Sequence, residues 1–316
     1  MSGQILALVG RQGEPPPATP KAAEKLIGAL LQHLRQERGM NQDEVVRSVS
    51  GFGSVPKLSR YENATGTLKA DHVFALLHFY EAPEDCVREA EMLLQWPHEQ
   101  TWWSAFADVA TPELMSLYAL ESTSKVVQVY QENYVPGMLQ TAGYARALMT
   151  DFARAQVDPE TRRSYLAAIE RRLEVRLRRQ HLLDHPTAPM YRAVIAESVL
   201  DKELGGVLVM REQLRHLFTV AENKPNVHLR ILPRSAMRQG SPLHPAITLC
   251  KPHEGTAGRL IYLEDKNVGG QLLTNTAQIE TFMASMDHWW RHALSKTETM
   301  GRLQYYIDRL ADETPQ

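Results

Sequence analysis

The sequence predicts a multidomain chain, with an all-α domain of five helices followed by a larger α+β (mixed α/β) domain. In the first hundred residues, apolar side chains recur at helical spacing and short glycine-containing or polar breaks separate the segments. Further along, alternating runs rich in valine, isoleucine and leucine stand between helical segments, bounded by proline and glycine. We expect a flexible arm over residues 1–20, the five-helix domain over 21–98 and the α+β domain over 99–316.

A first helix is predicted from Leu26 to Arg38, because its apolar residues fall on one face and Gly39 can end it. That face consists of Ile27, Leu30, Leu31 and Leu34. The second helix is expected to begin after Asn41, a favourable N-cap residue. Asp43 and Glu44 follow in its first turn, where acidic groups favour the helix dipole.

The third helix is predicted over Ser54–Asn63, after a break at residues 51–53 that contains two glycines. Ser54 can cap it, and Pro56 is tolerated because it lies in the first turn. The inward side chains are Leu58 and Tyr61, which leaves Lys57, Arg60 and Asn63 to face outward. A fourth helix through Val73–Tyr80 and an acidic fifth helix over Glu84–Gln95 complete the domain.

Two short helices around a glycine-containing turn, closed by the run from Ser59 to Asn63, resemble the repressor-like (xenobiotic-response-element type) helix-turn-helix family. The resemblance implies DNA binding, with Gln42 and Asn63 on phosphates and base-reading positions at Val55, Pro56 and Arg60. It also implies an ion pair between Arg35 and Glu62 that ties the first helix to the reading helix.

The three base-reading positions differ in their capacity to form hydrogen bonds. Val55 and Pro56 offer no side-chain hydrogen bond and can only touch a thymine methyl group, whereas Arg60 suits a bidentate contact to guanine. We expect Gln42, Ser54, Lys57 and Asn63 to contact phosphates and so to position the helix. The alternative is a helical hairpin with no nucleic-acid function inside a larger α domain.

The chain is close to neutral, with a net charge of −2. Between Glu24 and Tyr80, seven basic side chains stand against six acidic ones. Because phosphate neutralisation supplies most non-specific DNA affinity, we expect that affinity to be modest and to fall early as salt rises. A homodimer that reads two half-sites of double-stranded DNA would recover it.

In the second domain, strands are predicted in runs of alternating or β-branched residues, and helices where the apolar spacing is helical. The predicted strands are 125–130, 191–196, 227–232, 246–250 and 260–264. The predicted helices are 141–149, 159–183, 207–221, 277–293 and 298–311. The order of the strands does not follow from the sequence.

The segment Tyr134–Leu148, reading YVPGMLQTAGYARAL, and the Trp102-Trp103 pair resemble actinomycete antitoxin-like transcriptional regulators. In those proteins a repressor-like helix-turn-helix is joined to a C-terminal domain of uncharacterised function. The resemblance implies that the second domain is regulatory or binds a small partner protein. A domain that senses a small molecule is a third possibility.

Arginines cluster on the predicted helix 159–183, where Arg172, Arg176 and Arg179 share a face. Such a face can bind phosphate or an acidic partner. Glutamates interleave with the arginines, so we expect a solvated, ion-paired surface.

Several functional classes have no support in the sequence. It has no apolar run long enough to cross a membrane and no secretory signal, and its two cysteines imply no disulfide framework, so we expect a cytoplasmic protein. It has no P-loop, Rossmann glycine pattern or G-x-S-x-G motif. His288 and His292 stand four residues apart without a third ligand. We therefore expect no enzymatic activity, no cofactor and no metal site.

Overall fold

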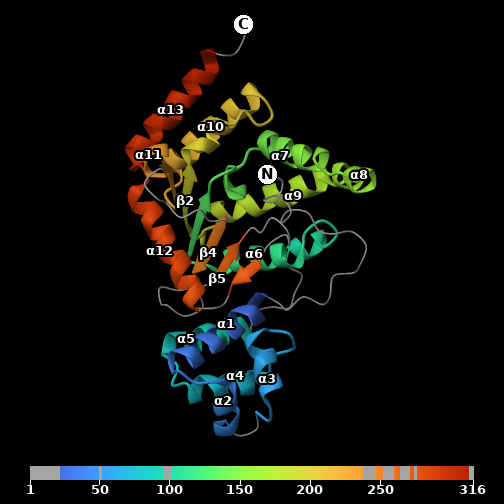
Figure 1. Cartoon of the computed structure of the whole chain (residues 1–316), viewed down its shortest axis with the longest axis vertical. Helices are drawn as coiled ribbons and strands as arrows, with labels where there is room; N and C mark the ends of the chain where they lie inside the picture. The colour runs from blue at the N-terminus through green and yellow to red at the C-terminus, as the bar shows by residue number, and fades with distance from the viewer. Residues whose placement is uncertain are drawn as a thin grey trace.

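The computed structural model describes residues 22–49, 52–94, 102–237, 246–251, 260–263, 271–273 and 276–312. A helical domain lies at one end of the molecule, and a larger C-terminal domain built on a six-stranded sheet forms the rest (Figure 1). This confirms the predicted fold class of both parts. The arm predicted over residues 1–20, and Gly51 in the predicted break, lie outside the described residues.

The helical domain contains the five helices that the sequence predicts: α1 (Ala22–Glu37), α2 (Gln42–Ser48), α3 (Val55–Glu62), α4 (Ala70–Phe79) and α5 (Glu84–Leu94). A reciprocal capping box begins α2. The Asn41 side chain accepts from the Glu44 N–H at 2.9 Å, and the Glu44 carboxylate accepts from the Asn41 N–H at 2.8 Å. Ser54 stands at the N-cap of α3, but its side chain makes no capping hydrogen bond, so this part of the prediction was wrong.

Helix α1 lies close to α3 because residue 28 is a glycine. A Cβ atom there would stand 2.5 Å from the backbone oxygen of Glu62 and 2.7 Å from that of Tyr61. The buried core of the domain then includes Leu30 and Leu31 of α1 and Leu58 of α3, all without exposed surface. A side chain at position 28 would force these helices apart.

The C-terminal domain begins with η2 (Trp102–Phe106) and continues through helices and strands. The further helices are α6 (Pro112–Thr123), η3 (Gly137–Leu139), α7 (Ala142–Arg154), α8 (Pro159–Ala167), α9 (Ile169–Gln180), η4 (His181–Asp184), η5 (Glu197–Val199), α10 (Val207–Asn223), α11 (Arg234–Met237), α12 (Thr276–His292) and α13 (Lys296–Asp312). The strands are β1 (Val126–Gln131), β2 (Met190–Ala196), β3 (Val227–Leu232), β4 (Ile247–Lys251), β5 (Leu260–Leu263) and β6 (Gln271–Leu273).

The strand order is β3-β2-β1-β4-β5-β6. The pairs β1–β2 and β2–β3 are parallel, while β1–β4, β4–β5 and β5–β6 are antiparallel. The five predicted strands are confirmed. The sequence analysis did not anticipate α6, the short helix α11 or β6.

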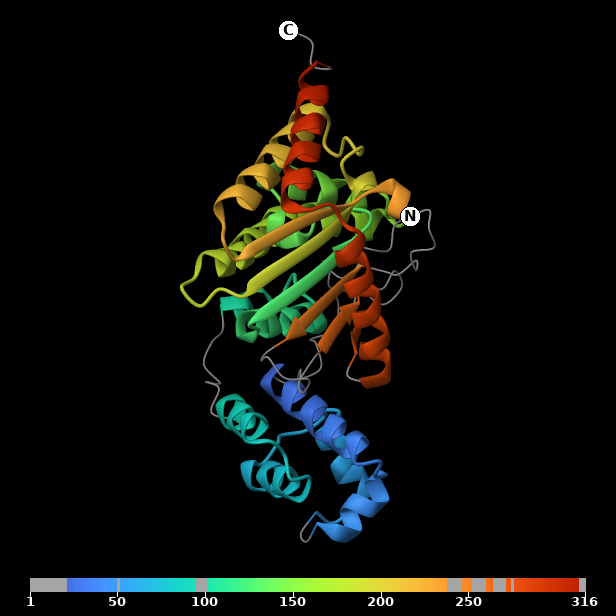
Figure 2. The same ribbon diagram turned by 90° about the vertical axis from the view of Figure 1, so that its left-hand side faces the viewer.

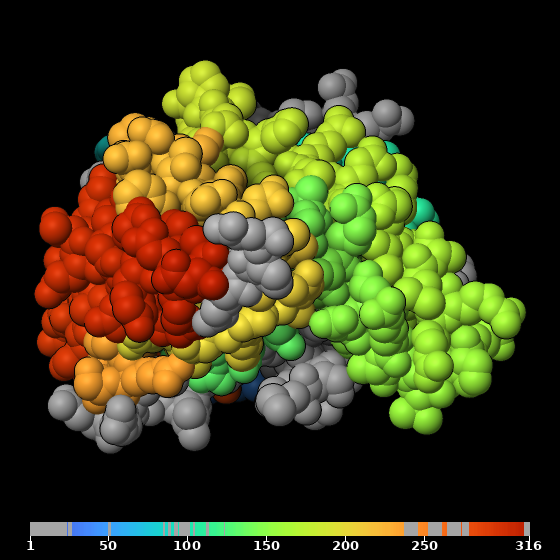
Figure 3. Space-filling view, turned by 90° about the horizontal axis from the view of Figure 1, so that it is seen from above, coloured from blue at the N-terminus to red at the C-terminus, as the bar shows by residue number. Residues whose placement is uncertain are grey.

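Helices cover both faces of the sheet. One face carries Val129, Ala193 and Leu229, which belong to an apolar cluster with α7, α10 and α13. The other face carries Tyr130, whose ring stacks on Trp289 of α12 at 3.7 Å between centroids. Figure 2 shows the strands running together through this domain, and Figure 3 shows α13, α10 and α7–α9 side by side at the end away from the helical domain.

The long helix predicted over 159–183 is instead two helices, α8 and α9, which meet at Ala168. Leu166 and Leu173 would share one face of a continuous helix, yet Leu166 is 42% exposed while Leu173 is buried. The arginines predicted to face solvent are buried: Arg172 is 5% exposed, Arg176 4% and Arg179 9%. The break accounts for the exposure of Leu166. The arginines are buried beside Ile169 and Leu173 because groups distant in sequence accept from two of them: Glu121 from Arg179 and Gln140 from Arg176.

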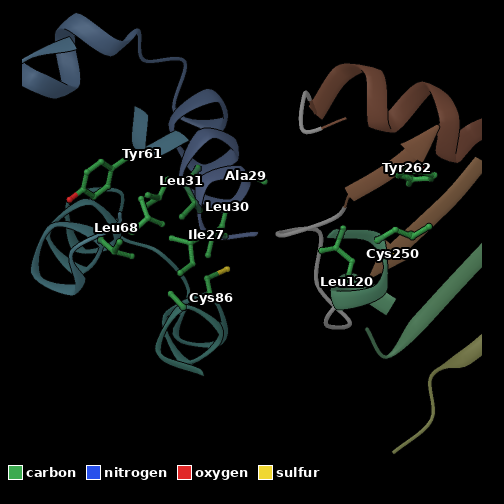
Figure 4. Close-up of a cluster of buried hydrophobic side chains, with 14 of the residues drawn as sticks. Ile27, Ala29, Leu30, Leu31, Tyr61, Leu68, Cys86, Leu120, Cys250 and Tyr262 are labelled. Carbon is green, nitrogen blue, oxygen red and sulfur yellow. The ribbon is translucent and has the colours of Figure 1, made fainter. Parts of the chain in front are cut away.

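The two domains meet where α6 packs against α1. One apolar cluster includes side chains from both sides of this contact. Figure 4 shows Ile27, Leu30 and Leu31 on one side and Leu120, Cys250 and Tyr262 on the other. Helix α6 therefore connects the core of the C-terminal domain to the first helix of the helical domain.

Candidate nucleic-acid interface

The buried carboxylate of Glu62 holds the C-terminal end of α3 in place. Arg35 of α1 donates from Nε to Oε1 at 2.6 Å and from Nη2 to Oε2 at 2.9 Å. Arg35 also donates from Nη1 to the Met40 carbonyl at 2.8 Å, and Gln42 donates from Nε2 to Oε2 of Glu62 at 2.8 Å. The ion pair expected between Arg35 and Glu62 is therefore present, and it joins α1, α2 and α3.

The hydrogen bond from Arg35 to Glu62 raises the pKa of the guanidinium above its ordinary value, against the opposing effect of burial. Glu62 is only 3% exposed, so this carboxylate is compensated almost entirely by protein groups. Removing either partner would leave a buried charge with too few hydrogen bonds.

An aromatic cluster fixes the side of α3 that faces the domain. Phe52 and Tyr61 meet edge to face at 5.2 Å, and His72 of α4 lies 5.5 Å from Phe52. The Tyr61 hydroxyl lies 2.8 Å from His72 Nδ1 and accepts from the Lys69 N–H at 3.1 Å. These contacts join α3 to the start of α4, so α3 is held at both its inner face and its C-terminal end.

Burial lowers the pKa of His72, and the nearby charges of Lys57 and Lys69 lower it further. Lys57 Nζ lies 3.4 Å from His72 Nε2 and 5.0 Å from the centroid of the Phe52 ring. Lys57 is thus half-buried against the aromatic cluster, with its charge at the edge of the exposed face.

The outer face of α3 contains most of the predicted contact residues. Ser54, Pro56, Arg60 and Asn63 are exposed, and Val55 is half-buried. Arg60 Nε donates to the Pro56 carbonyl at 3.3 Å, along the helix surface. The side-chain amide of Asn63 already makes a hydrogen bond within the protein, because its Nδ2 donates to the Ser59 carbonyl at 2.8 Å.

Gln42 lies apart from that face, half-buried at the start of α2. One N–H of its amide serves Glu62, and an amide nitrogen carries a second N–H that can serve a phosphate. The arrangement gives Gln42 a structural role that the sequence analysis did not assign.

Two further features of this surface were not predicted from the sequence. The loop between α3 and α4 exposes Thr65, Gly66, Thr67 and Lys69 beside the C-terminal end of α3. Its Lys69 and the exposed Arg47 of α2 are cations that a phosphate backbone can meet. The excess of Thr and Gly after Asn63 was the available signal, because such residues mark an exposed loop.

The conspicuous segment Tyr134–Leu148 has a structural explanation. Gln213 of α10, fully buried, accepts from the Thr141 N–H and donates to the Leu139 carbonyl, both at 2.7 Å. Gln180 of α9 donates to the Gly137 and Gln140 carbonyls at 2.9 and 2.8 Å. These amides satisfy backbone groups of a buried loop, so the sequence of this segment follows from packing.

The spacing of His288 and His292 has an ordinary structural explanation. His292 Nδ1 lies 2.8 Å from the His288 carbonyl, as expected of neighbouring turns of one helix. Within the described ranges, no group of three metal-ligating side chains comes together, and no helix is long and apolar enough to cross a membrane.

Comparison with protein families gives two matches. A family described as a helix-turn-helix domain matches residues 26–90, and one described as a domain of unknown function (DUF5753) matches residues 114–305. The first match supports a DNA-binding regulator, and together they confirm the architecture that the sequence predicts. Neither the curated proteins nor the solved structures give a significant match.

Proposed function

The chain belongs to the family of the domain of unknown function DUF5753 and has a helix-turn-helix domain before it, and on this premise we propose that it is a transcriptional regulator that reads the DNA major groove with α3. The helix-turn-helix domain occupies residues 21–98 and a regulatory or partner-binding domain occupies residues 99–316. The protein acts on double-stranded DNA in the cytoplasm as a homodimer.

The observation that carries the proposal is the contrast between the fixed C-terminal end of α3 and its exposed outer face. Glu62 and Tyr61 are fixed by buried contacts, while Ser54, Pro56 and Arg60 are exposed. A helix held in this way presents its outer side chains without a large entropic cost on binding.

Arg60 is the base reader in this proposal. Its guanidinium is exposed and can donate two parallel hydrogen bonds to O6 and N7 of guanine, while Val55 and Pro56 touch a thymine methyl group. Ser54, whose hydroxyl caps no helix, contacts a phosphate together with Gln42, Lys57 and Asn63.

Selection of bound fragments from random duplex DNA tests the proposal, using the purified full chain at physiological salt. We expect a palindromic motif whose half-sites lie about 34–36 Å apart, or a multiple of this, because a dimer places two recognition helices one helical turn apart. Failure to enrich any motif would contradict the proposal and favour a protein whose C-terminal domain binds a partner protein.

A further inference from the structure

Basic side chains gather on the sheet face that α12 packs against, near the beginnings of β2 and β3. Arg192 of β2 is in register with His228 of β3, and Arg230 lies two residues further along β3, so all three belong to the same face. His228 is exposed, and Met190, at the start of β2 on this face, is 39% exposed. Helix α12 therefore leaves the beginnings of these two strands uncovered.

Two guanidinium groups share one aromatic ring beside this uncovered part. The guanidinium groups of Arg230 and Arg192 lie 4.2 and 5.3 Å from the centroid of the Trp290 ring of α12. Arg230 also donates from Nη1 to the Trp290 carbonyl at 3.0 Å. The ring and the carbonyl thus hold two like charges close together.

Within the described residues, no carboxylate forms an ion pair with Arg192 or Arg230. The Nε atom of Arg192 is buried and has no hydrogen-bond partner there. Burial lowers the pKa of His228, and the charges of Arg192, Lys296 and Arg230 lower it further. Arg192, His228, Arg230, Lys296 and Trp290 thus form one positively charged surface, the basic face.

Other arginines of the same domain show which groups such side chains hold. Arg179 pairs with the buried carboxylate of Glu121. The exposed Arg146 donates from Nε and Nη2 to the two carboxylate oxygens of Glu170, at 2.7 and 3.0 Å. The planar guanidinium group matches the two oxygens of a carboxylate, so the basic face has the donors for an acidic partner.

We infer that the basic face binds an acidic segment of a partner protein, with carboxylates of that segment on Arg192 and Arg230. Apolar side chains of the same segment contact Trp290 and Met190. Tryptophan, arginine and methionine are enriched in protein–protein interfaces, and incoming carboxylates relieve the repulsion between the two guanidinium groups. The inference rests on the partner-binding role proposed for the C-terminal domain and does not depend on DNA reading by α3.

The position of the basic face favours a protein over DNA. Figure 1 shows α3 in the helical domain at one end of the molecule and β2 within the other domain, with β4 and β5 between them. A duplex that lies along α3 is therefore remote from β2, and the basic face is available to a different partner.

Selection from random peptides displayed on phage tests the inference, with the purified full chain as the target at physiological salt. We expect peptides rich in aspartate and glutamate that also contain an aromatic or aliphatic residue. Peptides without an excess of acidic residues would overturn the inference. One selected acidic peptide, labelled with fluorescein, then serves as the probe in anisotropy titrations.

Two double variants locate the peptide on the chain. Arg192→Gln with Arg230→Gln should weaken binding about tenfold or more, since hydrogen bonds between charged groups carry at least that much affinity. Arg154→Gln with Arg163→Gln removes two exposed arginines of α7 and α8, which lie on the other face of the sheet, and makes the same change in net charge. This control should bind like the wild type. Equal weakening in both double variants would overturn the inference.

His228→Glu keeps both arginines and alters an exposed position, so it serves if the arginine double variant does not fold. The new carboxylate competes for the guanidinium groups and repels the peptide, so we expect weakening of about tenfold. His78→Glu, at an exposed position of α4, is its control and should bind the peptide like the wild type. Wild-type affinity in the His228 variant would overturn the inference.

Binding of the same proteins to duplex DNA separates this inference from the function proposed for α3. The arginine double variant should keep the affinity of the wild type for DNA that carries the selected motif. A folded double variant that loses DNA and peptide alike would mean that the basic face binds nucleic acid, and would overturn the inference. Peptide binding at this face in a chain that selects no DNA motif would support the inference and refute DNA reading by α3.

Discussion

Two arginines, one in each domain, illustrate how differently the domains use charge. Arg35 in the helical domain meets Glu62 with both nitrogens of its side-on edge, and Gln42 completes the coordination of that carboxylate. Arg172 in the C-terminal domain is only 5% exposed, and its Nε and Nη2 atoms have no hydrogen-bond partner within the described parts of the chain. The first arrangement fixes the C-terminal end of α3, and the second leaves one edge of a guanidinium buried without a partner among the described residues.

The difference separates two ways in which a buried polar group contributes to function. Where every hydrogen bond is satisfied within the protein, as at Glu62, the group positions other residues. Where part of a guanidinium is buried without a partner, as at Arg172, no hydrogen bond from the described residues offsets the cost of desolvating it.

Leu58→Asp should abolish the fold of the helical domain. Leu58 has no exposed surface, so the variant buries an unpaired carboxylate in the centre of the domain, at a cost of several kcal/mol. Circular dichroism should show lost helix, and binding to the selected DNA should disappear. Val157→Asp, at a position that is 93% exposed, is the matched control and should melt like the wild type.

Glu62→Ala should reduce the free energy of unfolding by about 3–5 kcal/mol, because it leaves Arg35 buried without its partner. Urea denaturation measures the loss. The double variant Arg35→Met, Glu62→Leu should recover most of it, since both charges are then gone. Arg38→Ala, which breaks an exposed pair with Glu81, should cost much less. Equal losses for the buried and the exposed pair would remove the basis of the comparison.

Gly28→Ala should destabilise the chain by about 1–3 kcal/mol, because the added Cβ meets the α3 backbone rather than a movable side chain. In α13 of the other domain, Gly301 has no atom within 4 Å of an added Cβ and lies inside a helix. Gly301→Ala should therefore gain about 0.5–1 kcal/mol. Denaturant titrations should show a lower free energy of unfolding for the Gly28 variant and a higher one for the Gly301 variant. An unchanged free energy of unfolding in the Gly28 variant would contradict the close approach of α1 and α3.

The smallest expected effect concerns His72. Its pKa in the folded protein lies below the ordinary value of 6.5, so the unfolded chain takes up this proton first. The stability linked to His72 is therefore complete above about pH 6.5 and decreases as the pH falls toward the folded pKa. In urea titrations, the free energy of unfolding of the His72→Gln variant should decrease less between pH 7 and pH 5 than that of the wild type. An unchanged slope would mean that His72 does not titrate with folding.

The sequence predicted the helical domain well because its signals are local. The capping residue Asn41, the spacing of Ile27 to Leu34 and the turn after Val49 each act within a few residues. The exposed face of α3 followed from the same spacing. The role of Gly28 did not, because it depends on the backbone of Glu62, distant in sequence.

The C-terminal domain was harder to predict from the sequence, because its structure depends on contacts between residues that are distant in sequence. Arginines that alternate with glutamates on α9 have the pattern of a solvated helix, and their burial depends on distant partners: Glu121 for Arg179 and Gln140 for Arg176. Helix α6 was missed because Leu114, Leu117 and Leu120 are all buried and leave no clear polar face. Strand order likewise depends on tertiary pairing.

The central claim is that α3 reads DNA through Arg60, and motif selection with Arg60→Ala beside the wild type tests it most directly. We expect one base position in each half-site to lose its preference, at a cost of about 1–3 kcal/mol, while the remaining positions keep theirs. Arg47→Ala on α2, the matched control, should weaken binding at most uniformly and leave the motif intact. A motif that is unchanged in the Arg60 variant would contradict the claim.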